Sequence, residues 1–178
     1  KCFGNRYLLS TSVVNTGEVN TSVNLEVHSS PATTMAAFHA GIDIKENGGL
    51  VIPNNLSKEI IAESNKAVAQ VLGLGVKPIT EIKPTSLITN DKKFKKGNAY
   101  ASALAMISGV EAVNNDQSPN DLLRQISKGI TIYNNTSKLD PAIQDMLVKG
   151  LHKVADKIKE KSTDTSLLEV LIIDIHNA

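Results

Sequence analysis

The segment DPAIQDMLVKGLHKVADKIKEK, residues 140 to 161, carries the clearest secondary-structure signal in the chain. It begins with Asp140-Pro141, a capping residue followed by proline, which is a usual helix start. Its apolar residues recur every three or four positions and so form one narrow stripe along a helix, made of Ile143, Leu147, Leu151, Val154 and Ile158. The opposite face carries Lys149, Lys153, Lys157 and Lys161. The pattern predicts a long amphipathic helix that packs through this stripe.

Two segments before it have comparable helix signals. Ser118-Pro119-Asn120-Asp121 combines a serine cap, a proline at the first position and an acid in the first turn, and it predicts a helix that ends at Gly129. Residues 99 to about 113 are rich in alanine and predict a helix that neighbours can approach closely. The inner side of this second helix is predicted to carry Tyr100, Ala103, Leu104 and Ile107.

Two more helices are predicted earlier in the chain. Residues 32 to 40 follow Pro31 and precede Gly41, which suit a first helical turn and a helix end. Residues 56 to 72 carry an apolar stripe, with Asn54 or Asn55 as the predicted cap and Gly73 at the end. Residues 74 to 90 contain two prolines and are predicted to form an extended connection.

The N-terminal residues have the pattern of β-structure instead. Between Val19 and Val27 apolar and polar residues alternate, the period expected when one face of a strand is buried. Asn15-Thr16-Gly17 is a turn signal, and residues 6 to 14 can supply a partner strand. A two-stranded hairpin is marginal alone, so this one is expected to pack on the helices or to pair with strands from elsewhere.

These signals predict a mainly α fold: a bundle of about five short helices with a small N-terminal β-hairpin or strand extension (α+β). The expected division is a β extension over residues 1–29 and a helical domain over residues 30–178. The segment from Ser166 to His176 is apolar on nearly every side. We favour a helix over a strand there, and either form needs burial in the bundle or against another chain.

Composition excludes several classes of function. The chain has three Phe, three Tyr and no Trp, so the rings on which sugars, single-stranded bases and quaternary amines stack are scarce. The formal net charge is +1, which gives no global field to attract nucleic acid. The most apolar stretch, residues 167–175, is broken by Glu169 and Asp174 and is too short to span a membrane.

No local motif predicts catalysis, a metal or a cofactor. The four histidines lack a second ligand type at metal spacing, and no Gly-x-Ser-x-Gly or Walker motif occurs. A catalytic triad assembled from distant residues stays open. Cys2 is the single cysteine, which excludes an internal disulfide and leaves a free thiol, a link to another chain or a modified residue.

Two charged or polar clusters have a functional and a simpler interpretation. Residues 111–121 are rich in oxygen ligands, but an EF-hand count from Asp116 places Asp121 where glycine is required. We therefore predict a polar loop with a helix cap, and a Ca²⁺ site is the alternative. The lysines of residues 92–96 surround Phe94 and resemble a nucleic-acid or phosphate patch. One such cluster in a chain of nearly zero net charge is more typical of a solvated loop, which we predict here.

The order of these segments resembles a family. Residues 24–37, NLEVHSSPATTMAA, are similar to the start of a helical domain of bacterial cell-surface and secreted proteins that follows immunoglobulin-like or carboxypeptidase-regulatory-like β modules. Residues 65–74, 98–108 and 122–129 resemble later segments in the family's order, so the similarity covers roughly residues 24 to 155. Ala32 stands where the family usually has leucine.

The resemblance implies a non-enzymatic extracellular structural or interaction module of a bacterial surface protein, with no catalytic residues to transfer. One version of this class is a self-assembling filament subunit, with copies of itself or adjacent β modules as partners. Its predicted subunit contacts are Val19, Val23, Val27, Leu168, Leu171, Ile172 and Ile175, with Cys2 as a further intermolecular or modified thiol. The alternatives are an enzyme with a dispersed hydrolase-like site and a Ca²⁺-dependent adhesin.

Overall fold

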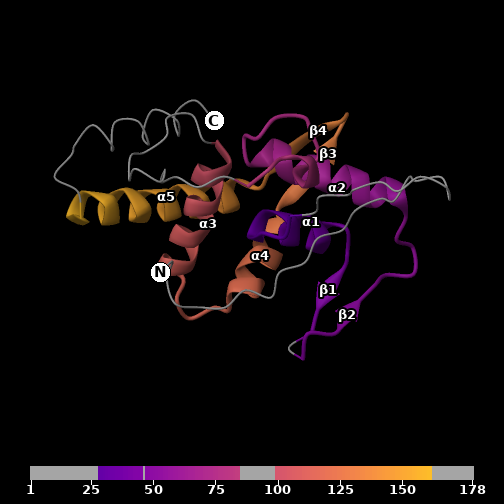
Figure 1. Ribbon diagram of the computed structural model, residues 1–178, viewed down its shortest axis with the longest axis horizontal. Helices are drawn as coiled ribbons and strands as arrows, with labels where there is room; N and C mark the ends of the chain where they lie inside the picture. The colour runs from indigo at the N-terminus through magenta and orange to yellow at the C-terminus, as the bar shows by residue number, and fades with distance from the viewer. Residues whose placement is uncertain (1–27, 46, 85–98, 162–178) are drawn as a thin grey trace.

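The computed structural model describes residues 28–45, 47–84 and 99–161, and within these ranges the fold is mainly α with two small β-hairpins (Figure 1). The first half holds α1 (Pro31–His39), β1 (Asp43–Ile44), β2 (Leu50–Val51), α2 (Lys58–Val71) and the 3₁₀ helix η1 (Ile79–Glu81). The second half holds α3 (Ala99–Val113), α4 (Pro119–Lys128), β3 (Ile130–Tyr133), β4 (Thr136–Leu139) and α5 (Pro141–Lys161). The predicted mainly α class is confirmed.

Serine caps set three of the helix starts. The Ser30 Oγ accepts the Thr33 amide at 3.2 Å, and the Ser118 Oγ accepts the Asp121 amide at 3.2 Å. The predicted Asn54 or Asn55 cap of α2 is wrong, because the cap is Ser57, whose Oγ accepts the Ile60 amide at 3.3 Å. The chain turns once more before this helix, so α2 begins two residues later than the apolar pattern indicates.

Helix α1 lies at the centre of the fold and packs against α2 and α4 (Figure 1). The core is aliphatic, as the composition predicts, and its largest side chains of under 2% exposure include Met35, Val68, Val110, Leu123 and Ile126. Tyr100 is the one buried ring among the described residues, and its hydroxyl lies 2.7 Å from the Ser30 Oγ. This contact ties the start of α3 to the start of α1.

Helices α3 and α5 cross with glycine facing glycine. A Cβ added at Gly109 would collide with the carbonyl of Gly150, and a Cβ added at Gly150 would lie 2.5 Å from the amide nitrogen of Val110. The backbones therefore touch at a distance that no side chain permits. The predicted stripe of α5 faces this crossing and the core, with Ile143, Leu147, Leu151 and Val154 all buried.

The described β-structure lies within residues 30–178, for which the sequence predicts only helices and loops. Strands β3 and β4 pair antiparallel with Tyr133 opposite Thr136. The two turn residues between them, Asn134 and Asn135, have φ of 48° and 60°, as a two-residue hairpin turn requires. The prediction of an extended connection over residues 74 to 90 is wrong in part. The 3₁₀ helix η1 forms there, and Ile79 is buried in the core with 1% exposure.

Three predicted segments lie wholly or mostly outside the described residues: the β extension of residues 1–29, of which only residues 28 and 29 are described, the lysine loop of residues 92–96 and the apolar segment of residues 166–176. The predicted contacts Val19, Val23, Val27, Leu168, Leu171, Ile172 and Ile175, and Cys2, lie there too. Within the described ranges, no helix combines the length and the hydropathy needed to cross a membrane.

Candidate interaction surface

Residues 42–53, here called the hairpin arm, extend from the helical body beside α4 (Figure 1). Strands β1 and β2 pair antiparallel, with Asp43 opposite Val51 and Ile44 opposite Leu50. At the tip the Lys45 amide donates to the Gly49 carbonyl at 2.8 Å, and the Gly48 amide donates to the Lys45 carbonyl at 2.9 Å. Gly48 has φ of +80°, which favours glycine at this turn.

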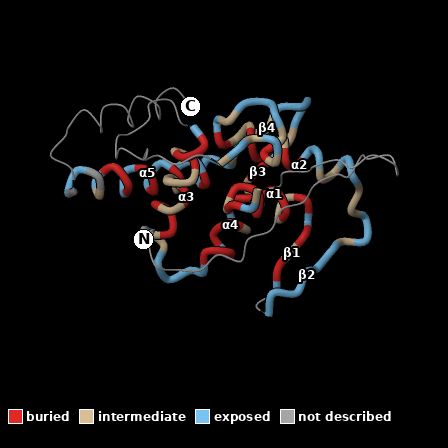
Figure 2. Tube along the Cα trace, viewed as in Figure 1, coloured by how far each residue is buried: buried red, intermediate tan, exposed pale blue. Residues whose placement is uncertain are grey.

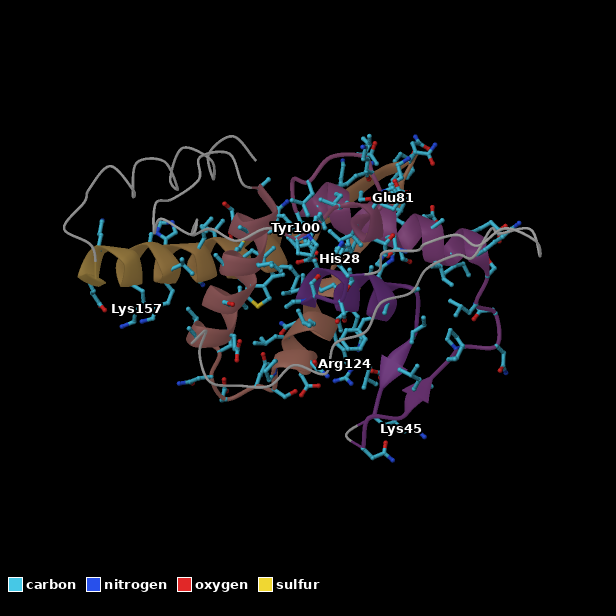
Figure 3. The ribbon with its side chains drawn as sticks, in the orientation of Figure 1. His28, Lys45, Glu81, Tyr100, Arg124 and Lys157 are labelled. Atoms are coloured by element: carbon cyan, nitrogen blue, oxygen red, sulfur yellow. The ribbon has the colours of Figure 1, made fainter. Side chains whose placement is uncertain are left out.

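Arg124 of α4 fixes the arm to the body (Figure 3). Its Nε donates to Asp43 Oδ1 at 2.7 Å, and its Nη2 donates to the Ile44 carbonyl at 2.6 Å. Its Nη1 donates to Asp121 Oδ1 at 2.7 Å, and its Cζ lies 4.9 Å from the centroid of the Phe38 ring. One guanidinium therefore joins β1, α1 and α4 through the fork of donors that lysine lacks.

Protonation states at this junction favour the ion pairs. Burial acts to raise the pKa of Asp43, but hydrogen bonds from Arg124 and from the Ile44 amide outweigh it, so this pKa lies below its usual value. Burial acts to lower the pKa of Arg124, and its bonds to Asp43 and Asp121 outweigh that effect and raise it. The junction is therefore charged at neutral pH.

The two strands of the arm differ sharply in burial (Figure 2). Ile42 and Ile44 on the β1 side are 8% and 5% exposed, which seats this strand on the body. Leu50, Val51 and Ile52 on the β2 side are 56%, 43% and 60% exposed. Residues 47–57 also contain no charged side chain. The arm thus presents three consecutive apolar side chains to solvent on a fixed support, which makes it a candidate interaction surface.

One serine–histidine contact among the described residues has the residue types of a hydrolase nucleophile and base, but it is buried in the fold. His39 Nδ1 lies 2.9 Å from the Ser64 Oγ and joins α1 to α2, but Ser64 is only 2% exposed. Burial lowers the pKa of His39, against the opposing effects of a hydrogen bond with the Ile130 backbone and of the Glu63 charge. A nucleophile has to meet its substrate, so this pair is suited to joining elements rather than to catalysis.

One of the three acids in the stretch considered as a Ca²⁺ site, Asp121, is bonded to side chains of its own helix start. Asp121 Oδ1 accepts Arg124 Nη1, and Asp121 Oδ2 accepts the Ser118 hydroxyl at 2.6 Å. Among the residues that the structure describes, no three His, Cys, Asp or Glu side chains group together as a metal site would require. Ser118 and Asp121 of this stretch therefore form the cap of α4.

The arm was missed by sequence reasoning, although part of its signal was present. Asn47-Gly48 between apolar residues is a strong hairpin signal, but each strand of the arm has only two residues, too few to show an alternating pattern in the sequence. Nothing local marks Arg124, because its partner Asp43 is 81 residues away in sequence. Comparison of the chain with protein-family models, curated proteins and solved structures finds no match.

Proposed function

We propose that this chain is a non-enzymatic structural or interaction module of a bacterial surface protein, which associates with copies of itself as a filament or array subunit. The observation that carries the proposal is the hairpin arm, whose exposed apolar strand is held on the body by Arg124. The extracellular location rests on the resemblance of residues 24–155 to helical domains of surface and secreted proteins.

The polar chemistry of the described residues supports a structural role. Ser64 and His39 bond each other inside the fold, Ser30 bonds Tyr100, and the Asp121 carboxylate is shared between Arg124 and Ser118. Groups that an enzyme would direct at a substrate here join one element to the next. The exposed strand of the arm, Leu50 to Ile52, is apolar and carries no charge, which suits a protein partner better than a small polar substrate.

Self-association should depend on the arm. Sedimentation velocity over a concentration series is expected to give a reversible shift from monomer to larger species. Ile52→Lys should weaken the association constant by about tenfold or more, because burying an isoleucine side chain contributes about 1.5–3 kcal/mol and a buried lysine charge opposes it. Ile52 is 60% exposed, so the substitution leaves the fold intact.

Val76→Lys is the matched control, because Val76 is 71% exposed and lies outside the arm. It should associate as the original chain does. A monomer at every concentration, or equal weakening by both substitutions, contradicts the proposal.

A further inference from the structure

We propose that the outer edge of β2 accepts the predicted strand Val19–Val27 of a second copy of the chain as an added strand. The inference rests on the proposed function and specifies the surface that carries it. It follows from the hydrogen bonding at the strand edges of the described residues, and from the sequence pattern of residues 19–27.

Three of the four strands in the described ranges have side chains bonded at their outer edges. On β1 the outward Ile44 carbonyl accepts Arg124 Nη2, and the Ile44 amide donates to Asp43 Oδ1 at 2.7 Å. On β4 the Ser137 amide donates to Gln70 Oε1 at 3.1 Å, and on β3 the His39 ring bonds the backbone of Ile130. These side chains block the addition of a further strand at those positions.

The outer edge of β2 has no such contact with any described side chain. Lys45 and Gly49 form a hydrogen-bonded pair at the tip, and Asp43 opposite Val51 is the next hydrogen-bonded pair in an antiparallel ladder. The amide and carbonyl of Leu50 therefore point away from β1. Backbone groups of alternate residues point to the same edge, so the amide and carbonyl of Ile52 point away from β1 as well. This edge lacks the lysine or the bulge with which proteins commonly protect an exposed strand, and only Pro53 limits it at one end.

Residues 19–27 have the properties of an added strand. Their alternation of apolar and polar residues requires an apolar surface on one side, and β2 exposes three consecutive apolar side chains. Residues 19–25 carry no charge, and neither do residues 47–57. Every register between the two segments is therefore free of like-charge repulsion.

A second copy supplies this strand more readily than the same chain does. Ser30 is fixed at the start of α1 by its capping box and by Tyr100, so only residues 28 to 30 link Val27 to a fixed point. Three residues span at most about 10 Å, whereas the nine residues of α1 extend about 13 Å before the arm begins. The fixed start of α1 therefore restricts how residues 19–27 can reach β2 of their own chain, whereas a second copy has no such restriction.

A disulfide scan on the full chain tests this inference. Every variant carries Cys2→Ser. One chain carries Val51→Cys, and the other, of different mass, carries a single cysteine at each of positions 20 to 26 in turn. After mixing under conditions of association and mild oxidation, the yield of mixed dimer should alternate with position, because successive side chains of a strand point to opposite faces. At the best positions, the yield of mixed dimer should be about tenfold higher than with a partner chain that carries Val76→Cys in place of Val51→Cys.

The outcomes separate this inference from the proposed function. If sedimentation shows association but the yield does not alternate, or matches that of Val76→Cys, the β2 edge is not the acceptor and the proposed function survives. If a single chain carrying both cysteines closes an internal disulfide at dilution, the strand pairs within its own chain and the second-copy proposal is overturned. If the chains never associate, both proposals fail.

Discussion

Replacing Gly150 by alanine should lower the free energy of unfolding by about 3 kcal/mol, although alanine is the better helix former. The Cβ at this position would lie 2.5 Å from the Val110 amide nitrogen and 2.8 Å from the Met106 carbonyl oxygen, and both are backbone atoms of α3. The helices have to separate to admit it, which loosens the packing of α5 on α3. Urea denaturation followed by circular dichroism measures the effect.

The neighbouring substitution Lys149→Ala is the control, because Lys149 is exposed and points away from the crossing. It should change stability by less than about 0.5 kcal/mol. Gly109→Ala, on α3, should lower the free energy of unfolding in the same way, because the added Cβ collides with the Gly150 carbonyl. In an isolated helix, glycine to alanine stabilises by up to about 1 kcal/mol. A stabilised Gly150→Ala protein would therefore contradict the close crossing.

Arg124→Met should lower the free energy of unfolding by about 2 kcal/mol, with the greatest loss of order in the hairpin arm. The change removes the hydrogen bonds to Asp43, Asp121 and the Ile44 carbonyl while keeping most of the side-chain volume. Asp43 and Asp121 are 49% and 58% exposed at the side chain, so solvent screening keeps the cost near the low end for charged hydrogen bonds. Amide hydrogen exchange across β1 and β2 reports the loss locally.

Two further variants separate the role of the guanidinium from that of its charge. Arg124→Lys keeps the charge, but its three N–H donors lie on one nitrogen and cannot match the planar fork that reaches these acceptors, so it should recover less than half of the lost stability. Lys157→Met removes another basic residue with an ion pair at 2.8 Å, to Glu160, where both side chains are largely exposed. It should cost less than about 0.5 kcal/mol. If Lys157→Met and Arg124→Met lower the free energy of unfolding equally, Arg124 contributes no more to stability than an exposed ion pair does, which contradicts its proposed role at the arm.

Helices were predictable from the sequence because their signals are local. Ser118-Pro119 and Asp140-Pro141 mark two starts, and the buried residues of α5 recur along one stripe. The cap of α2 was misplaced because Asn54, Asn55 and Ser57 all suit a cap, and the turn that precedes the helix decides among them. Local chemistry gives the existence of a helix more reliably than its first residue.

The candidate site was less predictable because it depends on contacts between distant segments. The two-residue strands of the arm are too short for an alternating pattern, and Arg124 acquires its role only when α4 lies beside β1. The close α3–α5 crossing was foreseen only in general terms, from the alanines of residues 99–113. Which glycines meet at the crossing depends on how two helices lie, and no single segment carries that information.

The central claim is that the outer edge of β2 is the surface through which copies associate. Amide hydrogen exchange measured at low and at high protein concentration tests it most directly. The amides of Leu50 and Ile52 should exchange about tenfold or more slowly in the associated protein, because the added strand bonds them. The Val51 amide, which faces β1, serves as the internal reference. Association without any change in exchange at Leu50 and Ile52 would contradict the claim.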